Sequence, residues 1–318
     1  MSRREDGEME CRTRNWRLAS RKKALQTRAA VLQAVRGFFQ RREYLEVETP
    51  HRIPAPAPEA HIDAVPAGGW FLHTSPELCM KRLLAAGYPR IFQLCHCWRE
   101  GERGSRHIPE FTMLEWYRAG TDYSGLMEET EALIQSVARS LRRRGRLAYG
   151  GRTIALASPW PRITVGEAFV RYAHTTAAAA LDQGLFDEIM VRDIEPQLGL
   201  DRPAFLYDYP AERGSLARLR ADNPSVAERF ELYIAGVELA NGFSELNDAA
   251  EQRTRFLQEE AYRRALGKRP YPLAEKFLEE LHDMPGAAGI ALGVDRLVML
   301  FADTTSIDDV VAFPPEEL

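Results

Sequence analysis

One polar loop between two strand-like runs constrains this chain more than any other stretch. The run from Arg90 to Trp98 is largely apolar, and a second run of similar character extends from Glu110 to Tyr117. We predict that the two runs pair as antiparallel strands. The connection between them is longer than the roughly 2–5 residues of ordinary hairpin loops, and long loops are usually functional or mobile.

The loop carries side chains whose chemistry suits phosphate. Its charged residues are Arg99, Glu100, Glu102, Arg103, Arg106 and His107, with glycines at Gly101 and Gly104. Guanidinium groups bind phosphate oxygens through paired donors. Phe111 follows closely enough to offer a ring face to a flat base. The alternative is a solvated loop whose charges pair with one another.

A second stretch strengthens the phosphate interpretation. Residues 286–300 form an apolar run with several glycines. The pattern predicts a strand that leads into a helix, with Asp295 as the cap and Arg296 at the helix start. A helix N-terminus attracts phosphate, and an arginine there adds a full charge. Under the alternative, a buried strand with glycines for close packing, the arginine would need a partner.

Two glutamates flank a predicted tight turn at residues 235–236. Counting outward from the turn places Glu238 opposite Tyr233 and Glu231 opposite Ala240. Both carboxylates would then lie on one side of the hairpin. They repel each other unless a cation lies between them, and magnesium bound to a nucleotide is the natural candidate. The alternative is a set of unrelated surface carboxylates.

Apolar spacing and turn signals predict the other main elements. We expect helices over 22–41 and 124–144, a helix opened by Ser75, Pro76 and Glu77, strands over 69–74 and 205–210, and an Ala-rich helical region over 164–200.

Together these stretches resemble the class II aminoacyl-tRNA synthetases. Residues 99–117 resemble motif 2, residues 289–300 motif 3, and residues 38–50 motif 1, the dimer-interface element. Residues 74–83 and 238–246 resemble the lysyl-tRNA synthetase branch. The likeness covers most of the chain. More closely, the chain is similar to the truncated lysyl-tRNA synthetase paralogues that act on elongation factor P.

The resemblance implies an α+β fold in which an antiparallel sheet is flanked by helices. We expect residues 22–318 to form this catalytic domain, and the charged residues 1–21 to be a partly disordered lead-in. It also implies a homodimer built on residues 38–50, where Phe38 and Phe39 form an apolar pair on a charged helix. We also expect no separate anticodon-binding barrel of the lysyl-tRNA synthetase kind, because the synthetase-like part begins within the first few tens of residues.

The resemblance further implies that ATP, with Mg²⁺, activates an amino acid as an aminoacyl-adenylate. Two anions must approach each other, so positive charge must already be in place. By motif position, Arg99 would clamp the α-phosphate and the substrate carboxylate, and Arg296 would hold the γ-phosphate. Glu231 and Glu238 would hold Mg²⁺. No general base is needed, because the attacking carboxylate is already ionised.

The wider site follows from the same motifs. The implied ATP-binding residues are Arg99, Glu100, Gly101, Glu102, Arg106, His107, Ile108, Phe111, Glu238, Leu239, Gly293 and Arg296. The implied substrate-binding residues are Ser75, Pro76, Glu77, Tyr117, Asn241, Glu245 and Ala291. Among the latter, Glu77 and Glu245 would hold a substrate ammonium group. Gly101, Ile108 and Ala291 depart from the usual motifs, which carry an acid, an asparagine and a glycine there.

The leading interpretation is an enzyme that transfers lysine or β-lysine to a lysine side chain of elongation factor P, without tRNA as a partner. One alternative is a tRNA-charging enzyme that obtains its anticodon module elsewhere. Another is a regulatory paralogue that binds an amino acid without activating it.

Composition bears on where the protein acts and on which partners it binds. The chain has 318 residues, of which 45% are hydrophobic, and its net charge of −4 provides no basic field for nucleic acid. We predict a cytoplasmic protein with no membrane span and with four free cysteines. Cys95-His96-Cys97 invites a zinc interpretation, but no second ligand pair follows at metal spacing.

Overall fold

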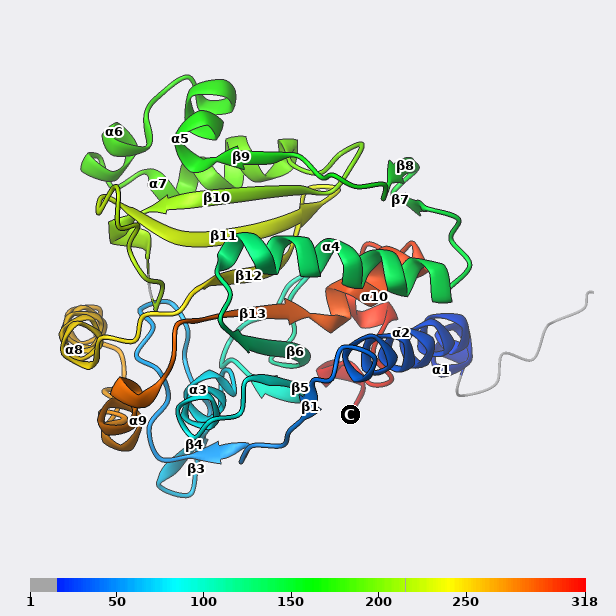
Figure 1. The fold of residues 1–318 in the computed structure, drawn as a ribbon. Helices are drawn as coiled ribbons and strands as arrows, with labels where there is room; N and C mark the ends of the chain where they lie inside the picture. The colour runs from blue at the N-terminus through cyan, green and yellow to red at the C-terminus, as the bar shows by residue number, and fades with distance from the viewer. Residues whose placement is uncertain (1–15, 215) are drawn as a thin grey trace, which may run out of the picture.

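An eight-stranded sheet runs through the part of the chain that the computed structural model describes, residues 16–214 and 216–318 (Figure 1). In spatial order its strands are β1 (Leu45–Glu46), β5 (Arg90–Trp98), β6 (Glu110–Ala119), β13 (Ala287–Gly293), β12 (Val237–Ser244), β11 (Val226–Ile234), β10 (Ala204–Pro210) and β9 (Arg162–Thr164). The central strands pair antiparallel, whereas the β1–β5 and β9–β10 pairs at the two edges are parallel. The α+β expectation is confirmed, with a mixed rather than a wholly antiparallel sheet.

The remaining elements surround this sheet. Two small sheets are formed by β2 (Arg52–Ile53), β4 (Trp70–Leu72) and β3 (Pro66–Ala67), and by β7 (Arg146–Tyr149) and β8 (Arg152–Ala155). The α-helices are α1 (Trp16–Ser20), α2 (Lys22–Gln40), α3 (Glu77–Ala85), α4 (Tyr123–Ser140), α5 (Val165–Ala168), α6 (Ala177–Asp182), α7 (Phe186–Ile189), α8 (Ala249–Ala265), α9 (Glu275–Glu280) and α10 (Val294–Ala302). Short 3₁₀- and π-helical turns are η1 (Phe169–Ala173), η2 (Met190–Ile194), η3 (Glu195–Gln197), η4 (Ala211–Arg213), η5 (Leu281–Asp283), η6 (Ile307–Asp309) and η7 (Pro315–Glu317). Among the helices described, none is long and apolar enough to cross a bilayer.

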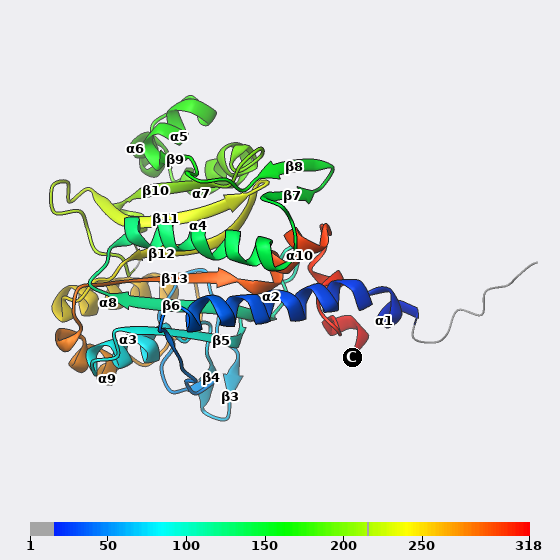
Figure 2. The same cartoon turned by 45° about the vertical axis from the view of Figure 1, so that its right-hand side comes forward.

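The two faces of the central strands differ in chemistry because side chains alternate along a strand. One face is apolar, and α2, α4 and α10 cover it, as both views in Figures 1 and 2 show. Its buried residues include Phe92, Leu114, Trp116, Phe230, Leu232, Ala240, Ile290 and Leu292. The opposite face carries the polar residues of the candidate site. At one end of that face, α3, α8 and α9 pack around Ile91, Tyr117 and Phe243.

Local signals explain where several elements begin and end. The predicted strand from Arg90 to Trp98 is β5. Helix α4 is capped by Asp122, whose side chain accepts a hydrogen bond from the backbone N–H of Gly125 at 3.0 Å. The predicted extension of this helix to residue 144 is wrong. The backbone at Arg142 and Arg144 has positive φ angles of 57° and 43°, which a continuing right-handed helix does not allow.

The N-terminal expectations are corrected in part. Phe38 and Phe39 are wholly buried, and the ring of Phe39 stacks on Phe92 with centroids 4.7 Å apart. The pair therefore packs inside the protomer and does not form an exposed apolar surface. Most of the expected lead-in lies outside the described residues. Where the two overlap, residues 16–20 form α1, and Arg21 binds the carboxylate of Glu317 at 2.6 Å.

The hairpin between β11 and β12 turns at residues 235–236, as predicted, with Glu238 opposite Tyr233. Glu231, however, lies opposite Asn241 and not Ala240. The register shifts between Leu232 and Tyr233, so one extra residue of β12 is accommodated as a bulge. The shift brings Asn241 beside Glu231 at the candidate site.

Asp295 does not cap the last helix. Gly293 precedes the first residue of α10, and Asp295 lies within its first turn. The buried carboxylate instead accepts a hydrogen bond from the backbone N–H of Thr112 at 2.7 Å and forms an ion pair with Arg28. This one side chain ties α10 to β6 and to α2.

We therefore expect Asp295→Ala to lower the free energy of unfolding by about 3–5 kcal/mol, because it leaves a largely buried guanidinium without its partner. Chemical denaturation of the purified protein measures this. Glu275→Ala is the matched control, since Glu275 pairs with Arg253 at the surface, where such pairs contribute little to stability. Equal effects of the two substitutions would contradict the assignment.

Candidate active site

The polar face of the sheet forms the floor of a cavity of about 350 Å³. Of the predicted ATP-binding residues, those that line it are Arg99, Glu102, Arg106, His107, Ile108, Phe111, Glu238, Leu239, Gly293 and Arg296. Asn241, Ala291 and Glu231 from the other predicted sets also line it. Residues nearly 200 positions apart in the sequence, such as Arg99 and Arg296, are thus brought together by the order of the strands.

Two of the predicted ATP-binding residues, Glu100 and Gly101, do not line this cavity. Glu100 is exposed, its backbone N–H donates to the carbonyl of Asp63 at 2.7 Å, and its side chain borders a separate hollow with Lys268. Gly101 follows it with a positive φ of 78°, a conformation that favours glycine. Of the two acidic residues in this loop, therefore, Glu102 lines the cavity and Glu100 does not.

Arg99 offers unsatisfied donors at the cavity. Its guanidinium lies over the ring of Phe111, 5.1 Å from the centroid, and 3.7 Å from the carboxylate of Glu102. Its Nε is buried and has no hydrogen-bond partner among the described residues. A buried donor without a partner is costly. The arrangement therefore fits an anionic ligand such as a phosphate or a carboxylate.

Arg296 lies at the start of α10 and holds the loop. It donates to the backbone carbonyl of Glu238 at 2.8 Å and contacts Nε2 of His107 at 2.6 Å. Burial, and then the charge of Arg296, lower the pKa of His107, so its ring is neutral at pH 7 and accepts this hydrogen bond. Arg296, Arg106 and His107 lie together here, because Arg296 Nε also donates to the Arg106 carbonyl at 3.3 Å.

One of the two candidate metal ligands, Glu231, is paired with an arginine that the sequence interpretation missed. Arg229 binds the carboxylate of Glu231 at 2.7 Å and donates to Asn241 at 3.1 Å. Burial raises the pKa of Glu231, and the neighbouring Glu238 adds to this, while Arg229 lowers it. The repulsion that suggested a metal ion is thus offset partly by Arg229 and Arg296. The partly exposed carboxylate of Glu238 still borders the cavity and suits a nucleotide-bound Mg²⁺.

The predicted ammonium-binding residues form a separate buried cluster at the α3 end of the sheet. Glu77 and Glu245 both lie 2.5 Å from the ammonium group of Lys81, which is wholly buried. Ser75 and Tyr117 both donate to Glu115, at 2.6 Å and 2.9 Å. Pro76 precedes α3, and Ser75 Oγ accepts from the backbone N–H of Glu77 at 2.9 Å.

Sequence interpretation missed Glu115 and Lys81. The signal for Glu115 was the alternation along β6, in which it shares a face with Phe111 and Met113. Burial, followed by the charge of Glu77, raises the pKa of Glu115 to about 8. Burial raises the pKa of Glu245 to about 8 although Lys81 lowers it. Glu245 Oε1 lacks a hydrogen-bond donor among the described residues, so the cluster fits a further ammonium group.

Small residues of β13 leave room for these side chains. A Cβ atom at Gly289 would lie 2.2 Å from the ring of Tyr117 and 2.3 Å from Glu245 Oε1. Glycine is therefore required there by close approach. Ala291 follows on the same face, paired with Asn241 on one side and Glu115 on the other. Ala291 thus lines the cavity and is also the register partner of Glu115 in the acidic cluster.

The comparisons with known proteins agree with this geometry. The family model for class II tRNA synthetases (D, K and N) matches residues 4–317. The chain belongs to the class II aminoacyl-tRNA synthetase family. This membership confirms the family assignment made from the three motifs and implies the use of ATP.

Individual relatives of this chain come from two branches of the family. An elongation factor P–(R)-β-lysine ligase of Pectobacterium carotovorum is 40% identical, and the match covers 96% of this chain and 98% of the relative. The ligase of the same name from Edwardsiella ictaluri is 41% identical over 94% and 97%. A lysine–tRNA ligase of Magnetococcus marinus is 37% identical, but that match covers 91% of this chain and 63% of the relative.

The raised pKa of Glu115 predicts a pH-dependent stability. The folded protein holds a proton on Glu115 between the ordinary pKa of about 4.5 and the raised value of about 8, whereas the unfolded chain does not. The contribution of Glu115 to the free energy of unfolding is therefore lost as the pH rises through this window. Glu115→Gln should flatten the dependence in urea denaturation between about pH 5 and 8.5.

Glu128→Gln is the control, because Glu128 is an exposed residue of α4. An unchanged slope in Glu115→Gln would refute the environment assigned to this carboxyl.

Proposed function

We propose that this protein activates lysine or (R)-β-lysine with ATP and transfers it to the side-chain amine of a lysine in elongation factor P. One observation carries the proposal. An acidic cluster of Glu77, Glu115 and Glu245, the last two of them buried, lies along the sheet from a cavity that contains Arg99 and Arg296. A ligand with ammonium groups and a carboxylate next to a nucleotide matches this order of charges.

In the first step, the substrate carboxylate attacks the α-phosphorus of ATP, an O–P bond forms, and pyrophosphate leaves. Arg99 neutralises the two approaching anions, and Arg296, fixed by His107 and the Glu238 carbonyl, holds the γ-phosphate. Mg²⁺, held by Glu231 and Glu238, would offset further phosphate charge. Phe111 would stack on adenine.

In the second step, the neutral amine of the acceptor lysine attacks the carbonyl carbon of the adenylate. A C–N bond forms, AMP leaves, and the amine loses a proton, so the product is an amide. Preorganised positive charge at Arg99 also stabilises the departing phosphate.

Two competing functions are less well supported. A tRNA-charging enzyme is disfavoured by the net charge of −4, and by the match to 98% of an elongation factor P ligase against 63% of a lysine–tRNA ligase. A regulatory paralogue that binds without activating would not need Arg99 and Arg296 at the same cavity. A cytoplasmic location is part of the proposal, because the acceptor is an elongation factor.

Pyrophosphate exchange followed by a choice of acceptors tests the function. The purified protein should exchange pyrophosphate into ATP with lysine or β-lysine present, and should then modify elongation factor P, seen as a mass increase on a single lysine. Exchange with transfer only to tRNA would favour the charging enzyme. Amino-acid binding without exchange would favour the regulatory paralogue.

We expect Arg99→Ala and Arg296→Ala each to reduce pyrophosphate exchange by at least about 10²–10³-fold, because each removes a positive charge at the reacting phosphates. Arg103→Ala is a matched control in the same loop, since Arg103 pairs with Asp308 and Glu316 and does not line the cavity. Near-normal exchange in either cavity variant, with the fold intact by circular dichroism, would refute the assigned role.

Ala291 should help to favour β-lysine over α-lysine. The two isomers differ in the position of one amino group relative to the carboxylate, and Ala291 both lines the cavity and pairs in register with Glu115 of the acidic cluster. Ala291→Gly should change the ratio of kcat/KM for the two lysines by roughly 10–200-fold. An unchanged ratio with activity preserved would assign selectivity elsewhere.

We also propose a homodimer built on residues 38–50. Strand β1 is an edge of the large sheet, and Leu45 on it is 50% exposed. Light scattering at micromolar concentration should give twice the protomer mass, and Leu45→Glu should reduce it toward one. A wild-type monomer would contradict the proposal.

A further inference from the structure

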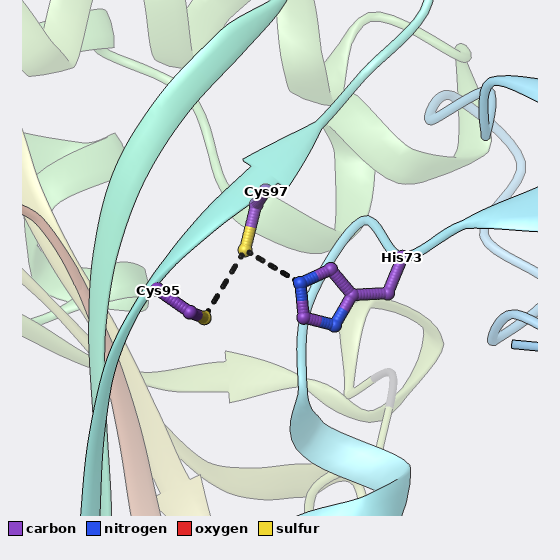
Figure 3. A group of neighbouring side chains, drawn as sticks. All are labelled: His73, Cys95 and Cys97. Atoms are coloured by element: carbon purple, nitrogen blue, oxygen red, sulfur yellow. Dashed lines mark hydrogen bonds between the residues drawn. The ribbon is translucent and has the colours of Figure 1, made fainter. Parts of the chain in front are cut away.

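We propose that His73, Cys95 and Cys97 form a binding site for a thiophilic divalent metal ion of the zinc type. The three residues are buried and come from two segments, the residues after β4 and strand β5 (Figure 3). The sequence interpretation considered a zinc site at residues 95–97 and set it aside because further ligands were missing. The structure supplies a third ligand from a different part of the chain.

The distances suit coordination. The two Sγ atoms lie 4.0 Å apart, and Cys97 Sγ lies 4.0 Å from Nε2 of His73. One ring nitrogen and both sulfur atoms all lie within 4.8 Å of one another. With Zn–S bonds of about 2.3 Å and Zn–N bonds of about 2.0–2.1 Å, a tetrahedral ion needs ligand atoms roughly 3.6–3.8 Å apart. Small movements of the three side chains would therefore bring their ligand atoms to these distances.

The neighbouring histidine is excluded as a ligand by its direction. The side chain of His96 lies on the opposite face of β5, where its Nδ1 contacts Glu110 at 2.8 Å and both side chains are about half exposed. Cys95 and Cys97 share the other face, as alternation requires. The set is thus two thiolates and one imidazole, which is a zinc-type donor set.

Coordination changes the protonation of all three ligands. The thiols would lose their protons to solvent, and His73 would bind as a neutral ring. In this structure His73 Nε2 also lies 2.8 Å from the carbonyl of His96, and Nδ1 is buried without a partner among the described residues. Binding through Nε2 would replace that hydrogen bond and leave the proton on Nδ1. Two thiolates balance the charge of a divalent ion.

The site adjoins the candidate active site. Cys95 and Cys97 pack with Met113, Phe111 and Ala291, which line the nucleotide cavity. His73 precedes Ser75, the residue that donates to Glu115. An ion here would link His73, two residues before Ser75, to β5. It would thereby fix the position of the Ser75–Glu77 segment, which contacts the acidic cluster. The fourth position of a tetrahedral ion would be taken by water or another small ligand.

Cobalt(II) is the probe, because cobalt bound to thiolate in a tetrahedral site absorbs strongly in the near-ultraviolet and visible ranges. The chain has four cysteines, so the double variant Cys11→Ser/Cys79→Ser retains only the two cysteines that are proposed as ligands. Under reducing conditions we expect this variant to bind one cobalt ion with thiolate absorption, and zinc to displace it. Cys95→Ser, Cys97→Ser and His73→Gln, each in that background, should weaken binding at least about 10-fold.

Three results would overturn the proposal. One is the absence of thiolate–cobalt absorption in the reduced double variant while circular dichroism shows it folded. The second is equal binding after Cys95→Ser or Cys97→Ser. The third is a disulfide between Cys95 and Cys97 that persists in reducing buffer. Mass spectrometry would detect it as a mass about 2 Da lower, and the two cysteines would then be a redox pair and not metal ligands.

Discussion

The alternation of side chains across the central strands is the constraint on which the rest of this structure depends. On β6, Leu114 and Trp116 face the helices, while Met113 and Glu115 face the other way. The same parity continues through β13, β12 and β11 by register. One sheet therefore serves both as a wall of the hydrophobic core and as a platform for charged groups. A slip of one residue in any central pair would exchange the two roles.

The fold and the arginine-containing end of the candidate site were largely predictable because their signals are local. Strand β5, the Arg99 loop and the strand–helix unit around Arg296 each follow from contiguous residues. The placement of Glu100 was not predictable, since it depends on a backbone bond to Asp63 from another segment. A bulge changed the partner of Glu231, and bulges leave little trace in sequence.

The buried ionic network was the hardest part to foresee. Lys81 resembles any amphipathic-helix lysine in sequence, and Arg229 resembles an ordinary strand residue. Their roles depend on Glu245 and Glu231, which approach them only when distant strands align. Likewise, the capping role expected for Asp295 fitted local rules, yet tertiary contacts with Arg28 and Thr112 decide its position. Local propensity predicted the helix, and long-range electrostatics determined what its side chains do.

The ammonium group of Lys81 has a consequence for ligand choice. It is chemically the same group as the end of a lysine side chain, and it already occupies part of the surface of Glu77 and Glu245. With Glu115, the cluster contains three carboxyl groups and one resident cation. An incoming ammonium group would favour the ionised forms of Glu115 and Glu245, whose pKa values burial raises to about 8, and the fully ionised cluster carries a formal charge of −2. A diamino acid brings two cations and restores neutrality in a region that excludes water, whereas a monoamino acid leaves one charge uncompensated. The number of positive charges on the amino acid, in addition to its shape, would then determine which amino acids bind at this site.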